Sequence, residues 1–296
     1  MNKLSLLLAL ALPLSASSQQ GSPQAAMGVG GYKVRKLAFE VTRENPPFRE
    51  TDVFVIAYPN TKSKRLVEGT NPAWSPDGER LAYCGREGRG FVQIQLINAD
   101  GSGHTQLTNL KGGACLPDWS PDGTKIVFAA NGAIFVMGKD GENITEINAG
   151  YGGRWSPDGQ QLLFCRSAES RHDSGSIWII NSDGTGATKV TDDNSNVLEA
   201  TWFPDGKSIA FSSEREHKRT SAIFRVNVDG SGLEPLAVDK QFGLFFPVLS
   251  PDGHQLVVDG FNEHPGEGGV LLRDLTGHHT SVLANGKHPS VLWEKY

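Results

Sequence analysis

The stretch Trp74-Ser75-Pro76-Asp77-Gly78 recurs along the chain and decides its fold. Its later copies occupy residues 119–123, 155–159, 202–206 and 249–253. The turn portion of each copy begins at residues 75, 120, 156, 203 and 250, which gives steps of 45, 36, 47 and 47 residues. A unit that repeats at this interval is typical of stacked or radially arranged modules rather than of one irregular core.

The chemistry of the repeated stretch predicts a tight turn. Proline fixes φ near the value required at the second turn position, aspartate tolerates the next one, and glycine accepts a positive φ at the exit. We interpret the large residue before each turn as a core residue between neighbouring sheets. Short runs with strand character follow the turns, at residues 81–83, 126–128, 162–164, 209–211 and 256–258.

Each repeat contains two more strand signals. A second apolar run occurs at residues 91–97, 134–137, 177–180, 223–226 and 270–272. A second turn, carrying Asp-Gly in four of the five repeats, and a short polar outer strand follow. With the strand that carries the aromatic residue, each unit has four antiparallel strands, and such units repeated in sequence form the blades of a β-propeller.

The number of blades follows from the spacing. Four intervals span 175 residues, or about 44 per unit, and residues 33–296 number 264, which makes six units. The first unit lacks a leading strand, whereas residues 288–293 resemble the leading strand of the others. We therefore predict an all-β, six-bladed propeller over residues 33–296, with a ring that the C-terminal strand closes.

The N-terminal residues indicate export. Residues 1–18 have the pattern of a signal peptide, with Lys3, an apolar run over residues 4–14 and small residues where cleavage would occur. Residues 19–32 are expected to form a flexible leader. We expect a periplasmic or secreted protein, and no later apolar segment is long enough to span a membrane. A net charge of −5 argues against a nucleic acid partner.

The three cysteines leave two interpretations open. Cys84 and Cys165 occupy equivalent places in repeats that are not neighbours, so a bond between them is not expected. Cys84 and Cys115 belong to adjacent repeats and can pair. We favour simple buried thiols for all three residues.

The repeat resembles that of TolB-like propellers. The resemblance rests on the Trp-Ser-Pro-Asp-Gly turn, the Ile/Leu-Ala/Val-Phe/Tyr strand after it and the Asp-Gly hairpin, and it covers residues 33–296. Similar propellers are attached to prolyl-oligopeptidase-type hydrolases and form certain periplasmic sugar lyases. The resemblance implies the propeller only, without the N-terminal α/β domain of TolB, and many activities use this fold.

Catalytic motifs are absent from the sequence. It contains no Gly-x-Ser-x-Gly, no His-Glu-x-x-His and no Cys-x-x-Cys. Residues 98–103 and 181–186 are similar to the start of a calcium loop but lack its distal glutamate, so hairpin turns are favoured. We therefore expect no catalytic residue, metal or other cofactor, and predict a non-catalytic binding module.

Five candidate binding residues occupy the predicted innermost strands. Asn71, Glu199 and His288 are at aligned positions, and Asp118 and Arg154 occupy the position two residues further along neighbouring strands. Asp118 and Arg154 can pair across the channel wall. The alternative function is a periplasmic sugar lyase or hydrolase that uses His288 and Glu199 at the channel mouth.

Longer polar loops share one end of the predicted propeller with the channel mouth. They cover residues 43–51, 85–90, 166–175, 213–221 and 261–268. The fourth has the densest charge and adds Arg215 and His217 to the candidate binding residues. We expect a monomer that binds a protein partner, or a small carbohydrate or peptide ligand, at this end.

Overall fold

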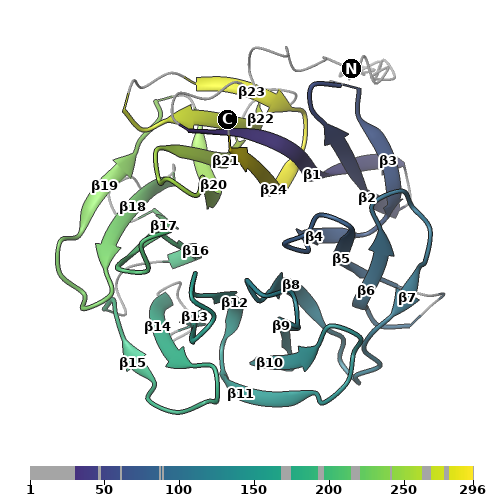
Figure 1. Ribbon diagram of the computed structural model, residues 1–296, viewed down its shortest axis with the longest axis horizontal. Coiled ribbons are helices and arrows are strands. Elements are labelled where there is room, and N and C mark those ends of the chain that lie inside the picture. The colour runs from purple at the N-terminus through teal and green to yellow at the C-terminus, as the bar shows by residue number, and fades with distance from the viewer. Residues whose placement is uncertain are drawn as a thin grey trace, which may run out of the picture.

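The computed structural model describes residues 31–45, 48–60, 62–86, 88, 90–167, 175–192, 197–214, 221–240, 242–261, 268–276 and 280–295. These residues form 24 strands in six four-stranded antiparallel sheets, arranged as a ring (Figure 1). The predicted all-β, six-bladed propeller is confirmed. Within the described ranges, no helix is long and apolar enough to cross a membrane.

The blades are numbered here from the first complete repeat, with strands given from the channel outward. Blade 1 is β4 (Thr70–Trp74), β5 (Arg80–Gly85), β6 (Gln93–Asn98) and β7 (Thr105–Gln106). Blade 2 is β8 (Cys115–Trp119), β9 (Lys125–Ala130), β10 (Ala133–Gly138) and β11 (Thr145–Ala149). Blade 3 is β12 (Tyr151–Trp155), β13 (Gln161–Ser167), β14 (Gly175–Asn181) and β15 (Thr188–Lys189).

The remaining blades follow the same plan. Blade 4 is β16 (Val197–Trp202), β17 (Ser208–Ser213), β18 (Ala222–Asn227) and β19 (Glu234–Ala237). Blade 5 is β20 (Gly243–Leu249), β21 (Gln255–Phe261), β22 (Gly268–Asp274) and β23 (Thr280–Ala284). Blade 6 combines both chain ends: β24 (Lys287–Lys295), β1 (Tyr32–Asn45), β2 (Phe48–Ala57) and β3 (Lys64–Glu68).

The C-terminal strand closes the ring, as predicted. β24 is the innermost strand of blade 6 and pairs antiparallel with β1, for example Leu37 with Val291. It also contacts blade 1, where the Trp74 backbone N–H donates to Ser290 Oγ at 3.0 Å. Closure in this way gives an inner strand to a sheet that would otherwise expose an unpaired edge along the channel.

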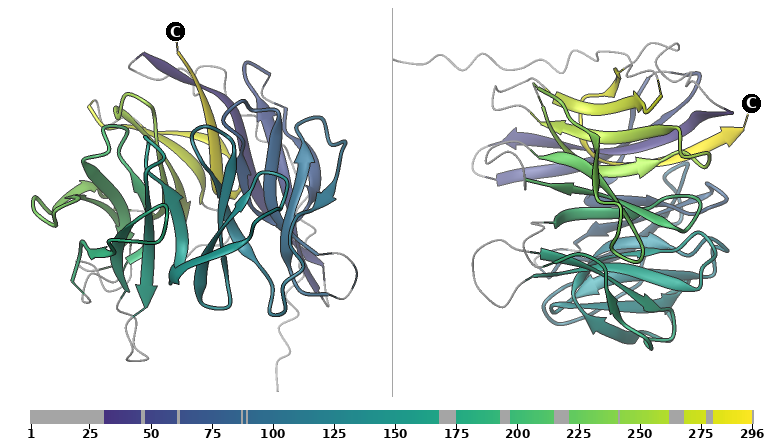
Figure 2. Two further views of the ribbon diagram at one scale, coloured as in Figure 1. Left: turned by 60° about the horizontal axis from the view of Figure 1, so that its bottom comes forward. Right: turned by 90° about the vertical axis from the view of Figure 1, so that its left-hand side faces the viewer.

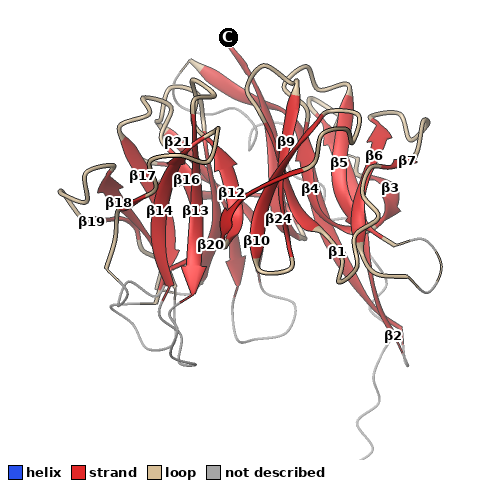
Figure 3. Ribbon diagram, turned by 90° about the horizontal axis from the view of Figure 1, so that it is seen from below, coloured by secondary structure: helices blue, strands red, loops and turns tan. Residues whose placement is uncertain are grey.

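The two ends of the propeller differ, and Figures 2 and 3 show the strands running between them. The turn face carries the Pro-Asp-Gly and Asp-Gly turns. The five exit glycines of the Pro-Asp-Gly turns have φ between 65° and 73°, as expected from the sequence. The mouth face carries the ends at which the inner strands begin.

Local side chains fix each Pro-Asp-Gly turn. In the first, Gly78 N–H donates to the Ser75 carbonyl at 2.8 Å, and Ser75 Oγ donates to Asp77 Oδ1 at 2.6 Å. The same aspartate oxygen accepts the N–H of Glu79 at 3.0 Å. These contacts lie within five residues of sequence, so the pentapeptide specifies the turn almost by itself.

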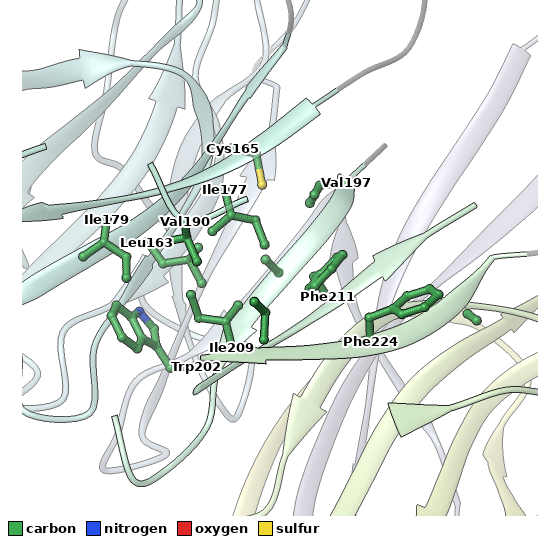
Figure 4. Close-up of a cluster of buried hydrophobic side chains, with 13 residues drawn as sticks. Leu163, Cys165, Ile177, Ile179, Val190, Val197, Trp202, Ile209, Phe211 and Phe224 are labelled. Carbon is green, nitrogen blue, oxygen red and sulfur yellow. The ribbon is translucent and has the colours of Figure 1, made fainter. Parts of the chain in front are cut away.

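The core lies between blades. Trp202 of blade 4, 6% exposed, packs with Leu163 and Ile179 of blade 3 in one buried cluster (Figure 4). Its indole N–H donates to the carbonyl of Arg154 at 3.2 Å, and Trp119 makes the same kind of bond to blade 1. The large residues before the turns are therefore core residues between neighbouring sheets, as we expected.

Two details of the sequence interpretation were wrong. Cys84 and Cys115 form a disulfide that joins blades 1 and 2, while Cys165 is a buried free thiol. The expected strand at residues 91–97 begins only at Gln93. The carbonyl of Val92 instead accepts the N–H of Ala114 in the connection to blade 2 at 2.8 Å, and Phe91 is 61% exposed.

Candidate functional site

A strained bulge opens nearly every inner strand at the mouth face. In five blades two residues of the inner strand face one residue of its partner, and the first of the two has positive φ. These residues are Asn71, Leu116, Gly152, Phe246 and His288. Residues other than glycine and asparagine rarely adopt a positive φ, and such backbone strain tends to occur at functional sites.

The inner strand of blade 4 lacks this left-handed bulge. Its irregularity lies one position earlier, between Val197 and Glu199, so that Glu199 pairs regularly with Ser212. Glu199 N–H donates to Ser212 Oγ at 3.1 Å. A Cβ added at Gly152 would lie 3.7 Å from Glu199 Oε2, so the carboxylate reaches toward blade 3 where the wall has no side chain. Glu199 therefore enters the channel from a different backbone conformation than the residues aligned with it in the other five blades.

The inner strands enclose a hollow of about 200 Å³ on the axis of the ring. Five of the seven residues predicted from the sequence line it: Asn71, Asp118, Arg154, Glu199 and His288. The other two, Arg215 and His217, lie outside the described residues. The structure thus brings together the inner-strand candidates and leaves the charged-loop candidates untested.

His288 and Asn71 share one buried carboxylate that the sequence interpretation missed. Glu40 of β1 is 4% exposed, and its Oε1 lies 2.6 Å from His288 Nδ1. The same oxygen accepts the backbone N–H of Asn71 at 2.5 Å. A carboxylate against one ring nitrogen fixes the orientation of the imidazole and leaves the other nitrogen for a ligand.

Two more residues of blade 5 hold His288 in place. The Phe246 ring meets the imidazole edge to face, with 3.9 Å between ring centroids. The Asp259 carboxylate accepts the backbone N–H of His288, and burial raises the pKa of Asp259 to about 6. His288 is therefore contacted from blades 5 and 6 although its side chain stays 26% exposed.

Asp118 and Arg154 do not form the predicted direct pair. Asp118 Oδ2 accepts the backbone N–H of Trp155 at 3.0 Å, so the carboxylate is used in joining blades 2 and 3. Among the described residues, the Arg154 guanidinium makes no ion pair within 4 Å. Its one hydrogen bond to them goes to the Gly153 carbonyl at 3.4 Å. Arg154 therefore keeps most of its donors for a ligand.

Burial controls the acidity of the carboxyls around Arg154. Desolvation raises the pKa of Asp118 and of Glu199, and the nearby charge of Arg154 opposes the rise in both. His288 opposes it further at Glu199. The Cys165 thiol nearby also has a raised pKa, through burial and the proximity of Glu199. Carboxyls that are desolvated and only partly compensated are typical of functional sites.

The arrangement of these groups suits polar recognition. Arg154 supplies donors, Glu199 and Asp118 supply acceptors, and His288 can do either. Among the described residues, no group of three His, Cys, Asp or Glu side chains is placed to hold a metal ion.

The sequence does carry a signal for the bulges. Asn71, Leu116, Phe246 and His288 each precede a proline, and a proline inside an apparent strand indicates an edge or a bulge. Glu40 and Asp259 gave no such signal. They are acidic residues inside strands of blades 6 and 5, and only the closure of the ring brings them to His288.

Comparison with protein families places the propeller among known sequences. A model of the TolB beta propeller domain matches residues 144–291, which are half of the chain. An uncharacterized protein of Agrobacterium fabrum is 28% identical over 233 residues, covering 72% of this chain and 74% of that protein. A TolB homologue of Chlorobium chlorochromatii is 40% identical over 175 residues, covering 57% of this chain and 39% of the homologue.

Comparison with solved structures agrees with the fold. The crystal structure of TolB from Acinetobacter baumannii matches with a TM-score of 0.72 and 20% identity. The match covers 88% of this chain and 67% of that one. At this identity the likeness concerns the propeller fold alone, and this chain spans about two fifths of the Chlorobium homologue.

Proposed function

Because the chain belongs to the family of TolB beta propeller domains, we propose that it is an exported binding module. Its channel mouth receives a polar side chain of a partner protein, and the module itself is non-catalytic. Residues 1–18 serve as the export signal, residues 19–32 as a leader and residues 33–296 as the propeller, in the periplasm or outside the cell. The relatives named as Tol-Pal system proteins belong to an assembly of proteins, which supports a protein partner.

The observation that carries this proposal is the Arg154 guanidinium, which lines the same hollow as Asp118, Glu199 and His288 and makes no ion pair with the described residues. The hollow of about 200 Å³ is smaller than the roughly 300–1,000 Å³ of most small-molecule sites. It therefore suits one side chain better than a whole ligand. A side-chain amide or hydroxyl would accept from Arg154 and donate to Glu199.

Capture of a partner from envelope extract tests the proposal. Immobilised wild-type protein and Arg154→Met are compared, since methionine keeps the apolar stem and removes the donors. The matched control is Asp183→Ser, at an exposed hairpin of the turn face. We expect proteins bound by the wild type and the control to be lost from Arg154→Met. Capture that survives Arg154→Met and fails with Asp183→Ser would place the working face at the other end.

A second candidate function is a sugar lyase or hydrolase centred on His288. The observation that favours it is the 2.6 Å contact between Glu40 and Nδ1, because an oriented imidazole can take up or deliver a proton at its other nitrogen. Digestion of acidic polysaccharides, followed by the ultraviolet absorbance of unsaturated products and by reducing ends, tests this function. Activity in the wild type that His288→Gln abolishes would support it, and no activity on any substrate would exclude it for those polymers.

A further inference from the structure

A second hollow lies on the mouth face beside the channel, over blade 2. Its volume is about 640 Å³, and its lining includes Arg86, Phe91, Gly112, Gly132 and Tyr151. We call this hollow the notch. The two hollows are neighbours: Cys115 lines the notch, and the next residue, Leu116, lines the channel mouth.

The notch exists because blade 2 is short at this face. Its β9 and β10 are joined by Asn131 and Gly132 alone, with φ of 50° and 78°, as in a type I′ hairpin turn. The corresponding connections of blades 1 and 3 comprise residues 86–92 and 168–174. Blade 2 therefore has the shortest of these three connections.

Glycine leaves the backbone uncovered at the turn of blade 2. Of the fourteen described residues that line the notch, five are glycines: Gly90, Gly112, Gly113, Gly132 and Gly150. A Cβ added at Gly132 would have no atom within 4 Å, so the space above this turn is open. Glycine permits close approach of another backbone, and such a surface suits the main chain of an extended peptide.

The side chains of the notch define the peptide that fits it. Phe91 is 61% exposed, and Val92 and the half-buried Tyr151 also line the notch, so the three residues offer it apolar contact surface. Arg86 is the one charged side chain among the described residues that line the notch, and it makes no ion pair with any described residue. Aromatic side chains and arginine are the groups that most often anchor protein interfaces.

We propose that the notch binds an extended peptide segment of a partner, in which an aromatic or aliphatic residue lies next to an aspartate or glutamate. The apolar residue packs against Phe91 and Tyr151, and the carboxylate binds Arg86 as a charge-assisted pair. The peptide backbone crosses the glycines of blade 2. This site is separate from the channel mouth, and the proposal does not depend on Arg154 or His288.

A display library of random linear octapeptides, selected on the wild-type protein, tests the proposal. Affinities of the enriched peptides are then measured by fluorescence anisotropy. We expect enriched sequences that combine an apolar residue with an acidic neighbour. Their affinity should fall about tenfold or more with Phe91→Ala, with Arg86→Glu and with Gly132→Asn, whose added side chain occupies the open space.

Matched variants keep the test specific. Phe261→Ala removes another exposed phenylalanine of the mouth face, and Gly206→Asn changes a glycine with φ of 65° on the turn face. Both should bind the peptides as the wild type does, and so should Arg154→Met. Loss with Arg154→Met alone would place the peptides in the channel and overturn the notch, while supporting the function proposed above. Failure to enrich any sequence, or enrichment of basic sequences, would also overturn it.

Discussion

The carboxylates of the turn face and those of the mouth face have opposite environments. On the turn face, the hydroxyl of Ser75 and the N–H of Glu79 lower the pKa of Asp77. Ser120 and Ser156 do the same for the aspartates two residues after them. At the mouth, burial raises the pKa of Asp118, Glu199 and Asp259.

This contrast separates structure from function. A turn-face aspartate is satisfied by neighbours in its own pentapeptide, so its charge stabilises the fold locally. A mouth-face carboxylate is desolvated by several blades at once and is stabilised less than it would be in water. Its ionised form therefore opposes folding, and such groups persist where a site uses them.

The largest expected effect comes from removing β24, the inner strand that closes the ring. Ending the chain at Lys287 deletes nearly all of β24, which carries His288 at the mouth and extends to Lys295 at the turn face. Val34, Leu37 and Ala38 of β1 lose their inner neighbour, and we expect a loss of more than about 5 kcal/mol in stability. Thermal unfolding followed by circular dichroism measures it. Ending the chain at Glu294 is the matched control, and equal melting of the two truncated forms would contradict closure by β24.

The next effect tests whether the mouth face depends on a covalent link that the turn face lacks. The disulfide closes a loop of 31 residues between Cys84 and Cys115. Its loss should reduce the free energy of unfolding by about 3–4 kcal/mol, because the unfolded chain gains freedom. Urea unfolding of the wild type with and without reductant measures this change. The double variant Cys84→Ala, Cys115→Ala should match the reduced protein and be insensitive to reductant, whereas an unchanged midpoint on reduction would refute the link.

A pH series tests the contrast in carboxylates directly. The pKa of Asp259 is about 6 in the folded protein against 3.8 ordinarily, so the folded state binds more protons between these values. Stability should therefore fall as pH rises through this window, by up to about 3 kcal/mol. Asp259→Asn keeps an oxygen for the His288 N–H and removes the charge. Its stability relative to the wild type should rise between about pH 4 and pH 7.

Asp158→Asn on the turn face is the opposite control for this series. The Ser156 hydroxyl lowers the pKa of Asp158, so its contribution to stability is present above the ordinary pKa and is lost as pH falls. The stability of Asp158→Asn relative to the wild type should therefore fall as pH rises toward the ordinary aspartate pKa of 3.8 and stay level above it. The same pH trend in Asp259→Asn and Asp158→Asn would show that the two faces do not differ in this way.

The smallest effect concerns one turn. Gly123 has φ of 69°, and a Cβ there would meet only Pro76 at an ordinary 3.6 Å, so strain arises from the backbone alone. Gly123→Val should destabilise by about 2 kcal/mol, and Pro121→Ala by less than about 1 kcal/mol. Chemical unfolding of the two variants measures the difference. Equal effects would mean that the positive φ of the exit glycine does not set the turn.

Local sequence carried most of the fold. The Ser-Pro-Asp-Gly turns and Asp-Gly hairpins are determined by contacts within about five residues, so their repetition predicts the strand order and the blade count. Alignment of the inner strands likewise predicts one shared channel for Asn71, Asp118, Arg154, Glu199 and His288, and all five line it. The repeat predicts this shared lining because every inner strand occupies the same place in its blade, so aligned residues face the same channel.

Contacts between residues that are far apart in the sequence were decided only by the tertiary structure. Glu40 and His288 lie 248 residues apart and meet because the C-terminal strand closes the ring. The Cys84–Cys115 bond, the exposure of Phe91 and the two-residue turn between β9 and β10 reflect how neighbouring blades differ at the mouth face. A sequence repeat describes what the blades share. The sites of this protein arise where the blades differ, and the relative position of those differences is set by packing across the ring rather than by local preference.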